Sequence, residues 1–137
     1  MEAATKKVFA QNLASLMASR NMSQSALAQK SGVSQRTISN MLNPDYDPRY
    51  SPTLNNIEKV ADALGISPWQ LLIEAVPTEV IASRDIEKLV HIFSTVSEEG
   101  RDAILSVGKR EVRYQKMVPP QSDTTKGNQE PETKRNP

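Results

Sequence analysis

The feature that most constrains the fold is a glycine between two short helical patterns, in the stretch SQSALAQKSGVSQRTISNML that runs from Ser23 to Leu42. The apolar residues on its two sides recur at helical spacing: Leu27 and Ala28 before it, then Ile38, Met41 and Leu42 after it. Gly32 is the residue type that most readily takes the left-handed conformation after a helix. The hydroxyls of Ser23 and Ser34 can each cap a helix start. The stretch therefore predicts two short helices joined by a tight turn.

These two helices must cross closely, because the turn between them is short. Ala28 supplies a small side chain where their backbones approach. Ile38 and Met41 anchor the second helix and leave its polar side chains facing outward. This arrangement is a helix-turn-helix.

Apolar periodicity predicts helices elsewhere in the chain. A helix of about fourteen residues contains Phe9 and ends near Arg20, a fourth runs from Ser51–Thr53 to Gly65, and Ser67-Pro68 starts a short fifth one. This fifth helix is expected to place Trp69 in the core. The proline-rich segment NPDYDPRYSPT, before the fourth helix, reads as a loop. Since no segment alternates as a strand would, the predicted fold class is all-α.

Beyond Pro77 the sequence predicts a two-helix C-terminal extension over residues 83–117 and then a tail. The first of these helices has an apolar stripe, and Ser97 caps the second. Residues 118–137 contain almost nothing to bury, so this tail is expected to be disordered.

The composition excludes several classes of function. The chain has no cysteine, one histidine (His91) and no Gly-rich phosphate loop, so it offers no plausible arrangement for catalysis, a metal or a cofactor. No apolar run approaches the roughly 18 residues that span a bilayer, and the N-terminus does not resemble a signal peptide. We therefore expect a cytoplasmic protein that is not an enzyme and that binds no cofactor, metal or membrane.

Charge is distributed unevenly although the net charge is only +1. Residues 1–52 carry six basic and three acidic side chains, a balance of +3, whereas residues 53–117 carry eight basic and ten acidic ones, a balance of −2. A basic N-terminal part suits a DNA-facing side, while the acidic part would face solvent or a partner.

The stretch quoted above, followed by SPTLNNIEKVADALGISPWQLL, closely resembles the phage repressor and Cro class, also called the xenobiotic-response-element family. The resemblance covers residues 6–75 and includes "S-Q-x-x-L-A", "G-V-S-x-x-x-I-S" and "A-L-G-I-S". It implies a five-helix repressor-type helix-turn-helix domain, over residues 5–76, that binds operator DNA as a dimer with helix 34–42 in the major groove. Leu42 stands where relatives often have an acid that pairs with an arginine on the first helix; here that position is Met17, and the two could pack together. The loop after helix 34–42 is also longer than usual.

The resemblance and the chemistry of the side chains together suggest the base contacts. Arg36 can bind guanine through its fork, and Gln35 or Asn40 can pair with adenine. For Thr37 and Ser39 three alternatives stay open: a base contact, a phosphate contact or exposure to water.

Phosphate contacts are expected from Gln24, Ser34, Asn43, Arg49 and Tyr50, with Lys6 or Lys7 at the edge. In the family, the glutamine at the position of Gln24 contacts a phosphate and braces the recognition helix; the alternative is a solvent-exposed polar residue. For Tyr46 and Tyr50 the alternative is local packing within the loop.

The extension is expected to supply a homodimer interface through Ile86, Leu89, Val90, Phe93 and Val96. Two heads spaced by one helical turn bind a near-palindromic site more tightly than one head binds a half-site. The alternative is that these helices fold back on their own head.

Two functions follow from the sequence. The first is a transcriptional regulator, most simply a repressor, whose partner is double-stranded operator DNA. Whether a regulatory protein partner controls it stays open. The second is a protein-interaction module, such as an antitoxin or coregulator. The Gln-Arg-Thr-Ser-Asn chemistry of helix 34–42 favours the first, because an interaction surface is richer in aromatic and aliphatic residues.

Overall fold

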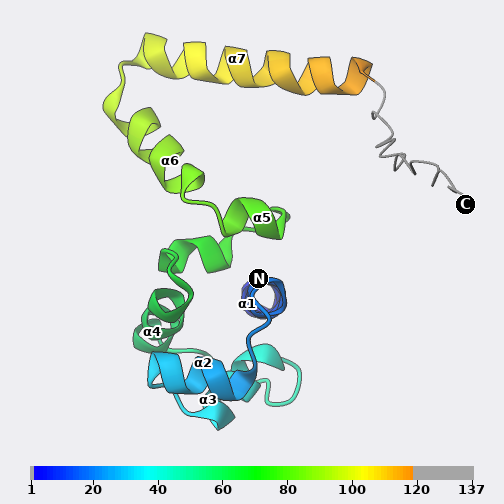
Figure 1. Cartoon of the computed structure of the whole chain (residues 1–137), viewed down its shortest axis with the longest axis vertical. Helices are drawn as coiled ribbons and strands as arrows, with labels where there is room; N and C mark the ends of the chain where they lie inside the picture. The colour runs from blue at the N-terminus through cyan, green and yellow to red at the C-terminus, as the bar shows by residue number, and fades with distance from the viewer. Residues whose placement is uncertain (1, 119–137) are drawn as a thin grey trace, which may run out of the picture. The chain divides into compact units, whose positions relative to one another are not determined.

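The computed structural model describes residues 2–118, and its regular elements within this range are all helical (Figure 1). In chain order they are α1 (Glu2–Ser19), α2 (Gln24–Ser31), α3 (Gln35–Leu42), α4 (Leu54–Leu64), the 3-10 helix η1 (Pro68–Leu72), α5 (Thr78–Ile81), α6 (Asp85–Thr95) and α7 (Glu98–Met117). The predicted all-α class is confirmed. Of the predicted tail, residues 119–137 lie outside the described residues.

The turn of the helix-turn-helix is built as the sequence predicts. The Ser23 hydroxyl oxygen accepts the backbone N–H of Ala26 at 3.1 Å, and that of Ser34 accepts the N–H of Thr37 at 3.1 Å. Between them Gly32 ends α2 with a φ of 72°, a conformation in which any side chain would be strained. The two caps and the glycine therefore fix where α2 ends and where α3 begins.

The helices enclose one apolar core. In this core α1 packs against α3 and η1, α2 packs against α3 and α4, and α5 packs against α1. Its members are Phe9, Leu13, Leu16, Met17, Leu27, Val33, Ile38, Met41, Ile57, Val60, Ala61, Ala63, Leu64, Ile66, Leu71 and Ile81. Leu42 is half-buried and packs against this core, to which Met17 belongs.

The first helix is joined to the end of η1 by a side-chain clamp. The amide nitrogen of Asn12 donates to the carbonyl oxygens of Leu71 at 3.0 Å and Ile73 at 2.9 Å. Backbone carbonyls at the end of a helix have no partner inside it, so the clamp satisfies two of them and holds α1 against η1.

The fifth predicted helix is present, but it is a 3-10 helix rather than an α-helix. With three residues per turn, Gln70 and Leu71 point inward, and Trp69 remains 38% exposed. The expectation of a core tryptophan is therefore wrong. The buried position belongs to Gln70, which is 1% exposed and which the apolar pattern did not identify.

The described part of the chain divides into two units, the first ending at Ser94 and the second beginning at Thr95. The first unit contains α5 and most of α6 in addition to the expected head, and Ile81 of α5 lies in the core. The Ser67 hydroxyl also donates to the Glu87 carboxylate of α6. The second unit contains α7, whose N-cap is Ser97 as expected. None of the helices in residues 2–118 has the length and hydrophobicity of a membrane span.

Candidate nucleic-acid interface

Helix α3 has one buried face and one polar face. Ile38 and Met41 are buried in the core, which turns Gln35 and Arg36 outward and leaves Asn40 half-exposed. The division follows from the 3.6-residue period of the helix, because the anchoring residues stand three apart. The side chains that can read base edges are therefore on the face that the core does not use.

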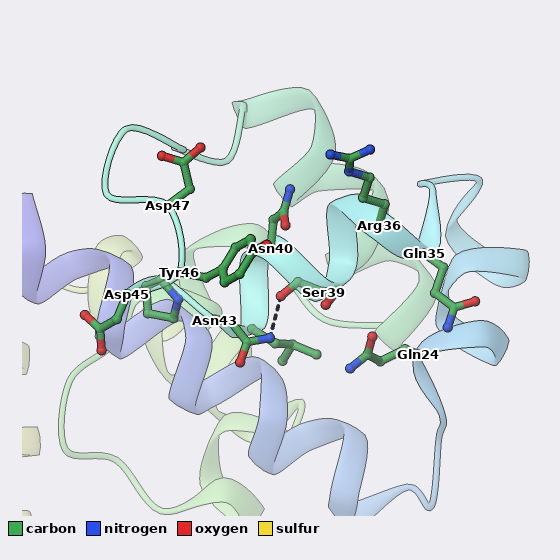
Figure 2. A pocket seen from close by; sticks show the side chains of 11 residues that line it. Gln24, Gln35, Arg36, Ser39, Asn40, Asn43, Asp45, Tyr46 and Asp47 are labelled. Atoms are coloured by element: carbon green, nitrogen blue, oxygen red, sulfur yellow. Dashed lines mark hydrogen bonds between the residues drawn. The ribbon is translucent and has the colours of Figure 1, made fainter.

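This polar face forms part of an open hollow, which we call the α3 hollow. It is lined by Gln24 of α2, by Gln35, Arg36, Ser39, Asn40 and Leu42 of α3, and by Asn43, Pro44, Asp45, Tyr46 and Asp47 of the following loop. Figure 2 shows Gln24 and Gln35 on one side of the hollow, and Asp45, Tyr46 and Asp47 on the other. Two helices and a loop thus contribute to one surface.

Four of the five predicted base contacts line this hollow: Gln35, Arg36, Ser39 and Asn40. Thr37 does not. Its hydroxyl oxygen lies 2.7 Å from that of Ser34, and its backbone N–H donates to the same Ser34 oxygen. Ser34 and Thr37 therefore form the N-terminal cap of α3, away from the hollow.

The predicted phosphate contacts are spread over several places. Gln24 and Asn43 line the hollow, and the amide nitrogen of Asn43 donates to the carbonyl oxygen of Ser39 at 2.8 Å, which caps the end of α3 (Figure 2). Arg49 lies outside the hollow, beside a second depression that Lys6 and Lys7 also line. Its side chain is 96% exposed, and its Nε lies 3.9 Å from a carboxylate oxygen of Asp47.

Two consecutive turns form the first part of the loop between α3 and α4. The backbone N–H of Tyr46 donates to the Asn43 carbonyl at 3.1 Å, and that of Tyr50 donates to the Asp47 carbonyl at 3.0 Å. Two lysines of α1 also hold this loop. Lys6 Nζ donates to the Pro48 carbonyl at 3.1 Å, and Lys7 Nζ lies 3.5 Å from the Asp45 carboxylate. The longer loop is therefore tied to the first helix.

The two tyrosines of the loop lie in opposite environments. Tyr50 is half-buried against the core, and its hydroxyl is buried with no hydrogen-bond partner among the described residues. Burial raises the pKa of this hydroxyl above its usual value of 10.0. Tyr46 is 84% exposed and lines the α3 hollow. The sequence predicts a phosphate contact for Tyr50 and no role for Tyr46. The loop has no periodicity that shows which of the two rings faces inward.

The charges around the hollow are mixed. Arg36 is the basic residue among those that line it, and Asp45 and Asp47 are the acidic ones. Lys7 and Arg49 lie close to these two carboxylates and partly balance them. The hollow is consequently not a uniformly basic surface. Hydrogen bonds and apolar contacts, in addition to charge attraction, must therefore contribute to any binding of nucleic acid there.

Comparison with known proteins bears on the same region. The chain has no match among the curated proteins or among the solved structures. A family model for the Cro/C1-type HTH DNA-binding domain matches residues 12–74. The matched segment begins within α1, contains the whole of α2, α3, α4 and η1, and includes every residue of the α3 hollow. Residues 12–74, somewhat less than half of the chain, are therefore similar to the Cro/C1-type helix-turn-helix DNA-binding domains.

Proposed function

We propose that the protein is a transcriptional repressor that binds a near-palindromic DNA operator as a homodimer, with α3 in the major groove. The Cro/C1-type domain supports sequence-specific DNA binding by a regulator. The observation that carries the proposal is the position of Gln35, Arg36 and Asn40 together on the uncovered face of α3. Guanidinium and amide side chains are the groups that pair with guanine and adenine edges.

In this proposal Arg36 is the principal base-reading residue, and Gln35 and Asn40 support it. Ser39 also lies within the hollow and can bond a base or a phosphate. Thr37 reads no base, because its hydroxyl and N–H are used in the cap with Ser34.

The phosphate contacts proposed are Gln24, Asn43 and Arg49. The guanidinium of Arg49 lies outside the hollow on a side chain that is 96% exposed, so a phosphate can approach it, and phosphate contacts position a protein without selecting sequence. Tyr50 is left out of this set, since a buried hydroxyl does not reach a phosphate. Ser34 is also left out of this set, because its hydroxyl oxygen already accepts the backbone N–H of Thr37.

The proposed dimer interface is the apolar stripe of α6. None of the described residues of α6 is buried, and Leu89 and Val90 are 53% and 49% exposed. Exposed apolar surface of this kind is suited to association. A dimer places two recognition helices about 34–36 Å apart on one face of the duplex, which a single head does not achieve.

The experiment that tests this function is the selection of bound sequences from random double-stranded DNA at physiological salt. We expect the full chain to enrich one motif whose two halves are related by a near-palindrome. Enrichment of a single, non-repeated half-site would argue against the dimer. Recovery of unrelated sequences would argue against sequence-specific binding itself.

A further inference from the structure

We propose that Tyr46 reads one thymine of the operator, by packing its ring against the 5-methyl group in the major groove. This inference rests on the proposed function, because it requires α3 to lie in that groove. It adds a base contact from the loop after α3, outside the recognition helix.

The position of Tyr46 is the first observation. It lines the same hollow as Arg36 and Asn40, and it is 84% exposed. A single exposed aromatic residue is ordinary on a protein surface. This one, however, lies on the surface that carries the base-reading side chains, so DNA seated on α3 covers it.

The loop fixes the backbone at Tyr46. Its backbone N–H closes a turn on the Asn43 carbonyl at 3.1 Å. Four residues further along the loop, Tyr50 packs against the core, while Lys6 and Lys7 of α1 bind Pro48 and Asp45. A ring presented from an anchored loop loses less conformational freedom on binding than one on a mobile loop.

The neighbours of Tyr46 decide between a phosphate and a base as its partner. Asp45 and Asp47 precede and follow it, and both line the hollow. Their carboxylates disfavour a phosphate in this part of the surface. The thymine methyl is uncharged and apolar, and it projects into the major groove, where protein side chains make apolar contact with it.

The test uses the full chain and two variants of this residue, Tyr46→Ala and Tyr46→Phe. Each is put through the random-DNA selection beside the wild type, with Tyr114→Ala as the control. Tyr114 is an exposed tyrosine on α7, outside the matched domain. We expect Tyr46→Ala to lose the preference for thymine at one position of each half-site, and Tyr46→Phe and Tyr114→Ala to keep it.

A second measurement removes the methyl group from the DNA instead. Each thymine of the selected operator is replaced by deoxyuridine in turn. We expect one replacement per half-site to weaken wild-type binding by about fourfold, the effect of burying one methyl group, and to leave Tyr46→Ala binding unchanged.

The failures of the two proposals are distinguishable. If the wild type enriches a motif and Tyr46→Ala enriches the same one with equal preference at every position, the Tyr46 contact is refuted and the proposed function stands. An equal weakening of all sequences by Tyr46→Ala would also refute it, because that result identifies a backbone contact. If the wild type enriches nothing, both proposals fail.

Discussion

The side-chain amide of Gln70, on η1, donates to the backbone carbonyl of Ile81, on α5, at 2.6 Å, and both residues are 1% exposed. The oxygen of the same amide accepts the N–H of Ser67 at 2.8 Å. One buried side chain therefore joins the start of η1 to a four-residue helix that is too short to be stable alone.

Gln70→Ala should consequently lower the free energy of unfolding by about 2–3 kcal/mol. The substitution leaves a buried carbonyl and a partly buried N–H without their Gln70 partner, and it also leaves a cavity. Urea unfolding of the full chain measures the loss. Gln29→Ala, at an exposed position of α2, is the control and should change stability little. Equal losses for the two variants would show that the buried bonds contribute nothing.

Arg36→Ala should relax the base preference at one position of each half-site and weaken operator binding by about 1–3 kcal/mol per contact. Arg36→Lys separates charge from geometry, since lysine keeps the charge but lacks the planar fork that binds guanine. Both variants should therefore lose selectivity, and the lysine variant should retain more overall affinity. Competition binding against operators altered at single positions measures this. Unchanged selectivity in both would remove Arg36 from the proposed readout.

Arg49→Ala should weaken binding to all DNA sequences by a similar factor. Its exposed guanidinium is proposed to contact a phosphate, so its loss should reduce the slope of log affinity against log salt by about 1. Titrations between roughly 50 and 200 mM salt give this slope. Arg84→Ala, an exposed position beyond the matched domain, serves as the control. A loss confined to one operator position would contradict the phosphate assignment.

Replacing Leu89 and Val90 together by glutamate should convert the proposed dimer to a monomer. Two carboxylates placed in an apolar interface should weaken association by about a hundredfold or more. Sedimentation equilibrium reports the change, and binding to the full operator should weaken with it. His91→Glu adds a carboxylate to the same helix at an exposed position and should remain a dimer if the apolar stripe is the interface. A doubly substituted chain that still dimerises would mean that α6 is not the contact.

Stability at high pH should depend on Tyr50. Burial raises the pKa of this hydroxyl in the folded protein. Below about pH 10 the residue is neutral in both states. As pH rises further, the unfolded chain ionises first, so the stability that Tyr50 contributes is lost as pH rises through the folded pKa.

This loss should appear in urea unfolding of the wild type between pH 9 and pH 11 and should be smaller in Tyr50→Phe. Between pH 7 and pH 9 the two proteins should show no difference in pH dependence. An equally steep decline in the variant would contradict the attribution to Tyr50.

Local signals were sufficient to predict the helix-turn-helix. Ser23, Gly32 and Ser34 act on the backbone within a few residues of themselves, so their roles follow from sequence alone. The anchoring of α3 by Ile38 and Met41 likewise follows from spacing. The same rules placed Gly65 correctly, where α4 ends at a φ of 64°.

Features that depend on distant contacts escaped prediction. Helix α5 (Thr78–Ile81) has too few residues for a period to show, and its attachment depends on Gln70, a polar residue that a hydrophobic pattern passes over. Trp69 is expected in the core because it follows the Ser-Pro helix start, but the tighter 3-10 turn points its neighbours inward instead. The inward ring of Tyr50 and the outward ring of Tyr46 depend on a loop held by lysines about forty residues earlier in the chain.

The clamp from Asn12 to Leu71 and Ile73 joins residues 59 and 61 positions apart. Closing so long a segment costs conformational entropy, which only the finished core offsets. During synthesis, α2 and α3 can pair while the chain is still emerging, because their contacts are local. The Asn12 clamp, although it starts from the first helix to be made, can form only after Ile73 has left the ribosome, so α1 is joined to η1 only when residues 2–73 have all been made.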